Sequence, residues 1–164
     1  MDIVVRKIEL KDAPSFWSAL SSVAQERKHI LTTEPPPFER AEEFVRENVE
    51  ENYAQFVALR DENVIGWADI IPLKHPKMTH VGALGIGILA AYRGRGIGSQ
   101  LLEKTVEHAW ASGLKRLELE VFADNEPAIR LYKKRGYVQE GLKRYARFID
   151  GQYQDIVVMA QVRI

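Results

Sequence analysis

Glycine and arginine are concentrated in one short run, residues 91–99, which reads AYRGRGIGS. Three of the five positions 94–98 are glycine, and the run joins an apolar, β-like segment over residues 81–89 to an amphipathic helical pattern. The first four N–H groups of a helix lack partners within it, and the helix dipole adds partial positive charge there. Bare backbone at this point can close around a phosphate-bearing ligand, and Arg93 and Arg95 add charge. The run therefore predicts a diphosphate site.

The spacing of the glycines separates this run from two other phosphate loops. A dinucleotide fingerprint, Gly-x-Gly-x-x-Gly, would need a glycine where Ser99 or Leu101 stands, and the Gly-Lys of a Walker loop is absent. The pattern present is Arg93-x-x-Gly96-x-Gly98. Its alternative interpretation is a glycine-rich turn that serves only to start a helix.

The composition describes an ordinary globular chain. It has 164 residues, 46% hydrophobic and 28% charged, and its 23 basic and 23 acidic side chains balance to a formal charge of zero. That balance argues against general affinity for nucleic acid or for an anionic membrane. The absence of cysteine excludes disulfides and thiolate chemistry. With no signal-like or membrane-spanning apolar run, we expect a cytoplasmic protein.

Hydrophobic periodicity predicts the order β, α, α, β, β, β, α, β, α, β, β. A strand, helix and strand over residues 81–122 imply a parallel pair, and the hairpins imply antiparallel pairs elsewhere. We therefore expect one mixed α/β domain over residues 1–164. The predicted strands cover residues 3–8, 55–60, 64–73, 81–89, 115–122, 137–148 and 154–164, and the helices cover 12–25, 39–51, 96–112 and 126–135.

Short-range signals mark the ends of several of these elements. Asp12 is expected to cap the first helix. Gly113 and Gly136 are placed to end the third and fourth helices in left-handed caps. Asp150-Gly151 is a strong turn signal for the last hairpin.

A second motif follows the fifth predicted strand, where residues 125–137 read NEPAIRLYKKRGY. This segment resembles the Asn-x-x-Ala-x-x-Leu-Tyr-x-x-x-Gly-Phe/Tyr block of the GNAT superfamily of N-acetyltransferases. The earlier run resembles that family's Arg/Gln-x-x-Gly-x-Gly/Ala signature, and the element order matches over essentially the whole chain. Residues 149–155 resemble the subgroup of small-molecule, amino-acid and ribosomal-protein acetyltransferases.

The resemblance implies a single GNAT-like α/β (α+β) domain. Its mixed central sheet would have about seven strands with helices on both faces, and the parallel fourth and fifth strands would splay apart. Acetyl-CoA would be the cosubstrate, without a metal. Its pantetheine arm would pair with the backbone of the fourth strand, and its diphosphate would lie on the amides of residues 93–99. The cofactor-binding residues so implied are Ile88, Leu89, Arg93, Gly94, Arg95, Gly96, Ile97, Gly98, Ser99, Asn125, Tyr132 and Lys134.

Three of these residues have simpler explanations. Arg95 is alternatively a solvated loop arginine. Asn125 can cap the fourth helix, which alone would account for it. Lys134 near that helix's end complements the dipole, whether or not it also approaches the adenosine 3′-phosphate.

Tyr132 is the predicted catalytic acid. Attack of an amine on the thioester forms an oxyanion and then expels a thiolate. Since a thiol has a pKa of about 8.5 and a tyrosine about 10, a positioned phenol can stabilise or protonate the departing sulfur. The resemblance supplies a backbone N–H near Ile88 for the oxyanion. The alternative for Tyr132 is aromatic packing on the core.

The general base is less defined, because residues 81–90 hold no glutamate, which many relatives place on this strand. Glu118 is the first candidate for the base or for binding the amine. Asp69 and Glu26 follow, both also as acceptor-binding candidates, and a water relay to bulk solvent is an equal account. For each carboxylate a structural ion pair is the alternative. The four histidines form no short helical pair typical of metal ligands.

The expected acceptor is the primary amine of a small molecule, an amino acid or a related amine, attacking acetyl-CoA directly in a ternary complex. Two alternatives stay open. One is acetylation of a protein N-terminus or lysine, with a groove between residues 25–38 and 143–153. The other is a non-catalytic acyl-CoA binding module. We expect no nucleic acid or membrane partner, and a homodimer by analogy with relatives.

Overall fold

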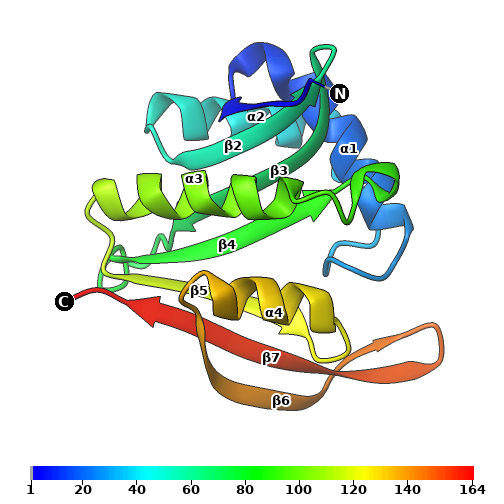
Figure 1. Ribbon diagram of the computed structural model, residues 1–164, viewed down its shortest axis with the longest axis vertical. Coiled ribbons are helices and arrows are strands. Elements are labelled where there is room, and N and C mark those ends of the chain that lie inside the picture. The colour runs from blue at the N-terminus through cyan, green and yellow to red at the C-terminus, as the bar shows by residue number, and fades with distance from the viewer. Residues whose placement is uncertain (1) are drawn as a thin grey trace. The chain divides into compact units, whose positions relative to one another are not determined.

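The computed structural model describes residues 2–164, and its elements follow the predicted order (Figure 1). Boundaries differ from the prediction only at the ends of elements. Short 3₁₀ turns at Leu10–Asp12 and Ala90–Tyr92 were not predicted. The strands are β1 (Val4–Lys7), β2 (Ala54–Arg60), β3 (Asn63–Pro72), β4 (Val81–Ile88), β5 (Arg116–Phe122), β6 (Val138–Ile149) and β7 (Gln152–Val162), and the helices are α1 (Ala13–Gln25), α2 (Phe38–Glu50), α3 (Ile97–Ala111) and α4 (Glu126–Lys134).

The seven strands form one mixed sheet in the order β1-β2-β3-β4-β5-β7-β6. β4 and β5 are parallel, as the strand–helix–strand pattern predicted, and β1–β2, β2–β3, β5–β7 and β6–β7 are antiparallel. The β4–β5 ladder consists of three pairs, from Val81↔Arg116 to Ala83↔Glu118. The predicted splaying of these strands beyond Ala83 stays a prediction.

Contacts between residues divide the chain into two compact units. The first runs to Ile71 and takes in Gly85–Gly113. The second consists of Pro72–Leu84 and Leu114–Ile164. The glycine-rich run lies in the first unit and Tyr132 in the second.

In the first unit, both faces of the strands are covered by helices (Figure 1). Val57 and Trp67 belong to a cluster with α1 and α2, whereas Phe56 and Ala58 pack with residues of α3. Neighbouring residues of a strand point to opposite faces, so this alternation sorts β2 between two cores. β2 is therefore apolar on both sides, which explains its near-continuous apolar sequence.

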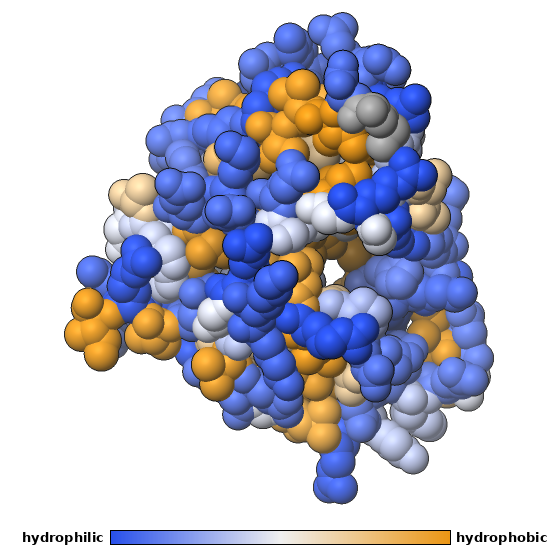
Figure 2. Space-filling model, in the orientation of Figure 1, coloured by the Kyte–Doolittle hydropathy of each residue, from blue (hydrophilic) through white to orange (hydrophobic). Residues whose placement is uncertain are grey.

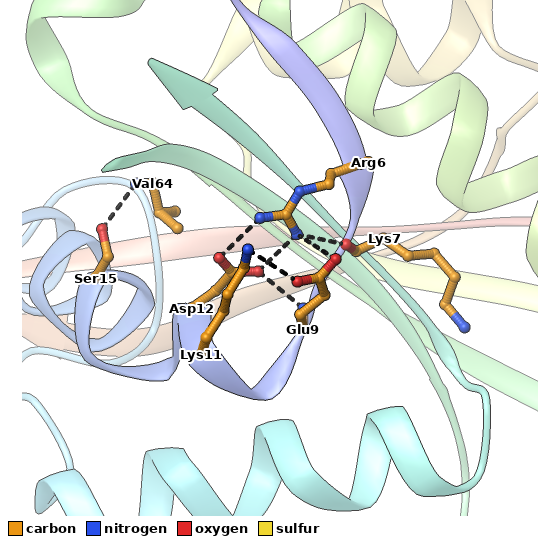
Figure 3. Close-up of polar contacts among 7 residues, drawn as sticks. All are labelled: Arg6, Lys7, Glu9, Lys11, Asp12, Ser15 and Val64. Atoms are coloured by element: carbon orange, nitrogen blue, oxygen red, sulfur yellow. Dashed lines mark hydrogen bonds and ion pairs between the residues drawn. The ribbon is translucent and has the colours of Figure 1, made fainter. Parts of the chain in front are cut away.

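The start of α1 differs from the expected cap (Figure 3). The Asp12 carboxylate does not bond to the first turn of α1. Instead it accepts from the Arg6 guanidinium at 2.7 and 3.0 Å and from the Glu9 N–H at 2.8 Å. An ionised donor makes a stronger bond than a helix N–H, so the buried carboxylate turns toward Arg6. Ser15 instead links α1 to β3 by accepting from the Val64 N–H at 2.7 Å.

In the second unit, β7 lies between β5 and β6, and α4 precedes the β6–β7 hairpin (Figure 1). The hairpin turns at Asp150 and Gly151, whose φ values of +50° and +78° confirm the predicted turn. Gly113 and Gly136 have φ values of +99° and +97°, so both predicted left-handed helix ends are confirmed.

The surface view shows polar side chains over most of one face, with scattered apolar groups (Figure 2). Within residues 2–164, no helix has both the length and the apolar character needed to span a membrane.

Candidate active site

The glycine-rich run forms the connection between β4 and α3. Gly94 and Gly96 have φ values of +73° and +79°, and a Cβ added at either would meet nothing within 4 Å. Glycine is therefore needed here for the backbone conformation and not for lack of space. Gly96 is the residue that caps the N-terminus of α3.

The first turn of α3 offers backbone donors. No side chain caps it, and within the described part of the chain the N–H groups of Gly96, Ile97 and Gly98 make no hydrogen bond to a carbonyl outside the helix. The Gln100 N–H donates to the Gly96 carbonyl at 3.2 Å. These donors and the dipole of a 15-residue helix make the turn suited to an anion.

Arg93 is held in a different way from the sequence expectation. Its Nε donates to the Ile88 carbonyl at 3.0 Å, and its two terminal nitrogens donate to the Glu26 carboxylate at 2.7 and 2.6 Å. This bidentate pair, chiefly through its hydrogen bonds, lowers the pKa of Glu26. The structure thus places both predicted site residues in one ion pair that ties the end of α1 to the end of β4.

A basic cluster that sequence reasoning missed lies beside the run. Arg60, at the end of β2, donates to the Tyr92 hydroxyl at 3.1 Å, and the Arg60 and Arg95 guanidinium groups lie 5.9 and 5.6 Å from the centre of the Tyr92 ring. Arg60 stands 32 residues before Tyr92. No local spacing in the sequence points to this contact.

The backbone at the end of β4 only partly matches the predicted pantetheine contacts. The Leu89 N–H donates to the Ile65 carbonyl of β3 at 2.9 Å, and the Leu89 carbonyl accepts from Tyr92 at 2.9 Å. Both groups of Leu89 are therefore occupied. Alternate residues of a strand direct their backbone groups to opposite sides, so Ile88 directs its N–H away from β3. The backbone of Leu89 is thus bonded within the protein, and pairing of the pantetheine arm with Ile88 stays a prediction.

Asp69, on β3, is the most perturbed carboxyl group of this unit. Its half-buried side chain lies over β4, where a Cβ at Gly85 would come 3.0 Å from its Oδ1. Loss of hydration raises its pKa to about 7. No hydrogen bond or ion pair of this carboxylate is found within residues 2–164. The sequence signal for Asp69 was a carboxylate within a predicted strand, residues 64–73, that is otherwise mostly apolar.

Glu118, on β5 of the second unit, is an ion-paired carboxylate. Its Oε2 accepts from the Arg116 Nε at 3.0 Å, and Arg116 also binds Glu140 at 2.7 and 3.0 Å. The geometry is that of the structural ion pair named as its alternative, and its catalytic role stays a prediction.

α4 carries the remaining predicted residues. The Asn125 Oδ1 accepts from the Ala128 N–H at 3.3 Å, so this side chain caps the helix and keeps its amide N–H groups for other partners. Tyr132 is 6% exposed, and its ring centre lies 6.0 Å from that of Tyr137. Burial raises the pKa of Tyr132, so its side chain remains a neutral phenol at physiological pH. Lys134 is exposed in the last turn.

No group of three or more histidine, aspartate and glutamate side chains suited to a metal occurs in the part of the chain that the structure describes.

Comparison with known proteins decides what kind of protein carries this loop. The sequence model of the acetyltransferase (GNAT) family matches residues 17–137. The chain belongs to this family. An L-amino acid N-acetyltransferase of Escherichia coli is 36% identical over 111 residues, 66% of this chain and 68% of the relative.

Solved structures of GNAT proteins share the fold. An acetyltransferase of the GNAT family from Streptococcus pneumoniae has a TM-score of 0.91 at 29% identity, over 99% of this chain and 100% of that one. A GNAT superfamily phosphinothricin acetyltransferase from Sinorhizobium meliloti was solved with acetyl-CoA. It has a TM-score of 0.90 at 21% identity, over 99% of this chain and 89% of that one. The predicted family, fold and enzyme class are confirmed, and the predicted cosubstrate agrees with that bound relative.

Proposed function

We propose that this GNAT acetyltransferase moves the acetyl group of acetyl-CoA to the primary amine of a small molecule, an amino acid or a related amine, by direct attack in a ternary complex. The observation that carries the proposal is the start of α3, where Gly94 and Gly96 adopt left-handed conformations. Within residues 2–164, the N–H groups of Gly96, Ile97 and Gly98 bond to no carbonyl outside the helix. Such donors bind the phosphate groups of a ligand.

The run 93–99 holds the diphosphate chiefly through its backbone. Because Glu26 and Ile88 occupy the Arg93 guanidinium, Arg95 supplies the side-chain charge within the run. The Ile88 N–H pairs with the pantetheine arm or holds the oxyanion. The amide N–H groups of Asn125 donate to the cofactor, and Lys134 approaches its 3′-phosphate.

Tyr132 is the proposed acid. Burial keeps its phenol protonated at neutral pH, and its hydroxyl makes no hydrogen bond within the described residues. A phenol in this state has a proton to give to the departing thiolate, and general-acid catalysis contributes about 10²- to 10⁴-fold.

The acceptor class has its support from the 36% identical relative, an L-amino acid N-acetyltransferase. The proposal takes residues 1–164 as one catalytic domain in the cytoplasm, with no nucleic acid or membrane partner. A homodimer remains a prediction.

The test is release of free thiol from acetyl-CoA in the presence of separate amino acids, polyamines and peptides. We expect turnover with one or more amino acids and little with peptides. Turnover confined to peptides would overturn the acceptor class. Coenzyme binding without turnover on any acceptor would leave a binding module and overturn the enzyme mechanism.

A further inference from the structure

Two side chains of β3 lie across the adjacent strand β4, each over a glycine. A Cβ at Gly87 would lie 2.3 Å from the Trp67 Cη2, and one at Gly85 would lie 3.0 Å from the Asp69 Oδ1. Residues two apart on a strand share a face, so Trp67 and Asp69 extend in the same direction. The glycines of β4 therefore make room for an indole and a carboxylate above the strand.

Two neighbours of Asp69 on this face, Gln55 and Trp67, are uncharged. Across β2 its register partner is Gln55, whose Oε1 accepts from Asn48 of α2 at 2.7 Å. Trp67 packs edge-on against Phe16 of α1 at 5.6 Å between ring centres. The carboxylate at the end of α1, Glu26, is already paired with Arg93.

Within residues 2–164, Asp69 is thus a carboxyl group without the partner that buried charges usually have. No charged side chain contributes to its pKa, which lost hydration alone raises to about 7. The residue as a whole is half-buried. A general base works best when its pKa lies near the operating pH, because it is then ionised in many molecules and still binds the proton that it removes.

We propose that Asp69 is the general base that deprotonates the acceptor amine, with Gly85 as the residue that lets its carboxylate lie over β4. This inference rests on the proposed function. The general base is then a residue of β3, and Glu118 of β5 remains in its ion pair with Arg116.

The proton balance of the step is complete. The amine arrives as an ammonium and gives one proton to the Asp69 carboxylate, which later releases it to solvent. The free amine forms the N–C bond to the thioester carbon, and the C–S bond then breaks. The second proton lost by nitrogen ends on the sulfur, so the products are the amide, the free thiol and one solvent proton.

The test uses the acceptor found in the panel and the pH dependence of kcat/KM. In the wild type we expect activity to rise with pH through a group with a pKa of about 7. Asp69→Asn should lower kcat by about 10²-fold or more and remove that rise, while coenzyme A still binds. Asp61→Asn makes the same chemical change at a turn carboxylate that is 90% exposed. It should leave both kcat and the pH dependence of kcat/KM unchanged.

A second pair of variants tests the geometry. Gly85→Ala places a Cβ 3.0 Å from the carboxylate and should lower kcat without loss of coenzyme affinity. Gly141→Ala, with nothing within 4 Å of its added Cβ, should behave as the wild type.

The outcomes distinguish the two proposals. Absence of turnover by the wild type with every acceptor overturns the proposed function. Turnover by Asp69→Asn within about two-fold of the wild type, with the same pH profile, overturns this inference alone. A lower kcat of Asp69→Asn, together with loss of the rise in kcat/KM near neutral pH, supports the assignment of Asp69 as the base.

Discussion

At the residue scale, the Tyr132 hydroxyl carries the clearest chemical expectation. Removing it while keeping the ring should leave packing on Tyr137 intact. We expect Tyr132→Phe to lower kcat about 10²-fold or more and to change the coenzyme Kd little, because only the proton donor is lost. Steady-state rates and calorimetric binding measure the two effects.

The matched control for this change is Tyr137→Phe, another buried tyrosine of the same unit. It should retain most of the activity. Equal rates for Tyr132→Phe and the wild type would remove Tyr132 from the mechanism, whatever the control does.

At the scale of the element, the start of α3 depends on a left-handed Gly96. Alanine there meets no atom within 4 Å but must adopt a φ of +79°, which costs roughly 1–2 kcal/mol. A relaxed first turn would also misalign the N–H donors. We therefore expect Gly96→Ala to lower both the free energy of unfolding and the affinity for coenzyme A.

Gly151 provides a control that separates these two effects. Its φ is +78° and an added Cβ again meets nothing within 4 Å, but it lies in the β6–β7 turn. Gly151→Ala should lose similar stability and keep its coenzyme affinity. Equal affinity in both variants would contradict the assignment of the diphosphate to the α3 turn.

At the scale of the whole molecule, Asp69 ties stability to pH. Its pKa rises from 3.8 to about 7 on folding, so between these values the folded state holds a proton that the unfolded state lacks. The wild type therefore loses stability as pH rises through this window. Asp69→Asn, which does not titrate, should be less stable relative to the wild type near pH 4 than near pH 8.

The size of this change is on the order of 2–4 kcal/mol, reduced by the solvent that still reaches the group. Urea unfolding of both proteins at several pH values measures it, with Asp61→Asn as the exposed control. If the difference in the free energy of unfolding between Asp69→Asn and the wild type does not vary with pH, the pKa of the Asp69 carboxyl is the same in the folded and unfolded states.

Much of this protein is determined by local sequence. Hydrophobic periodicity specifies the order of the strands and helices, and Gly113, Gly136 and Gly151 mark backbone conformations that other residues rarely adopt. The two family motifs are also contiguous. These features depend on neighbours along the chain, and so reading the sequence was enough to predict them.

Only the tertiary structure decided which charged groups meet. Glu26 and Arg93 are 67 residues apart, and Asp12 turned from its expected cap to Arg6. Asp69 became distinct because folding placed it over Gly85 and removed part of its hydration. The pKa and the partners of a side chain follow from the solvent and charges that packing brings to it, and these are not properties of its position in the sequence.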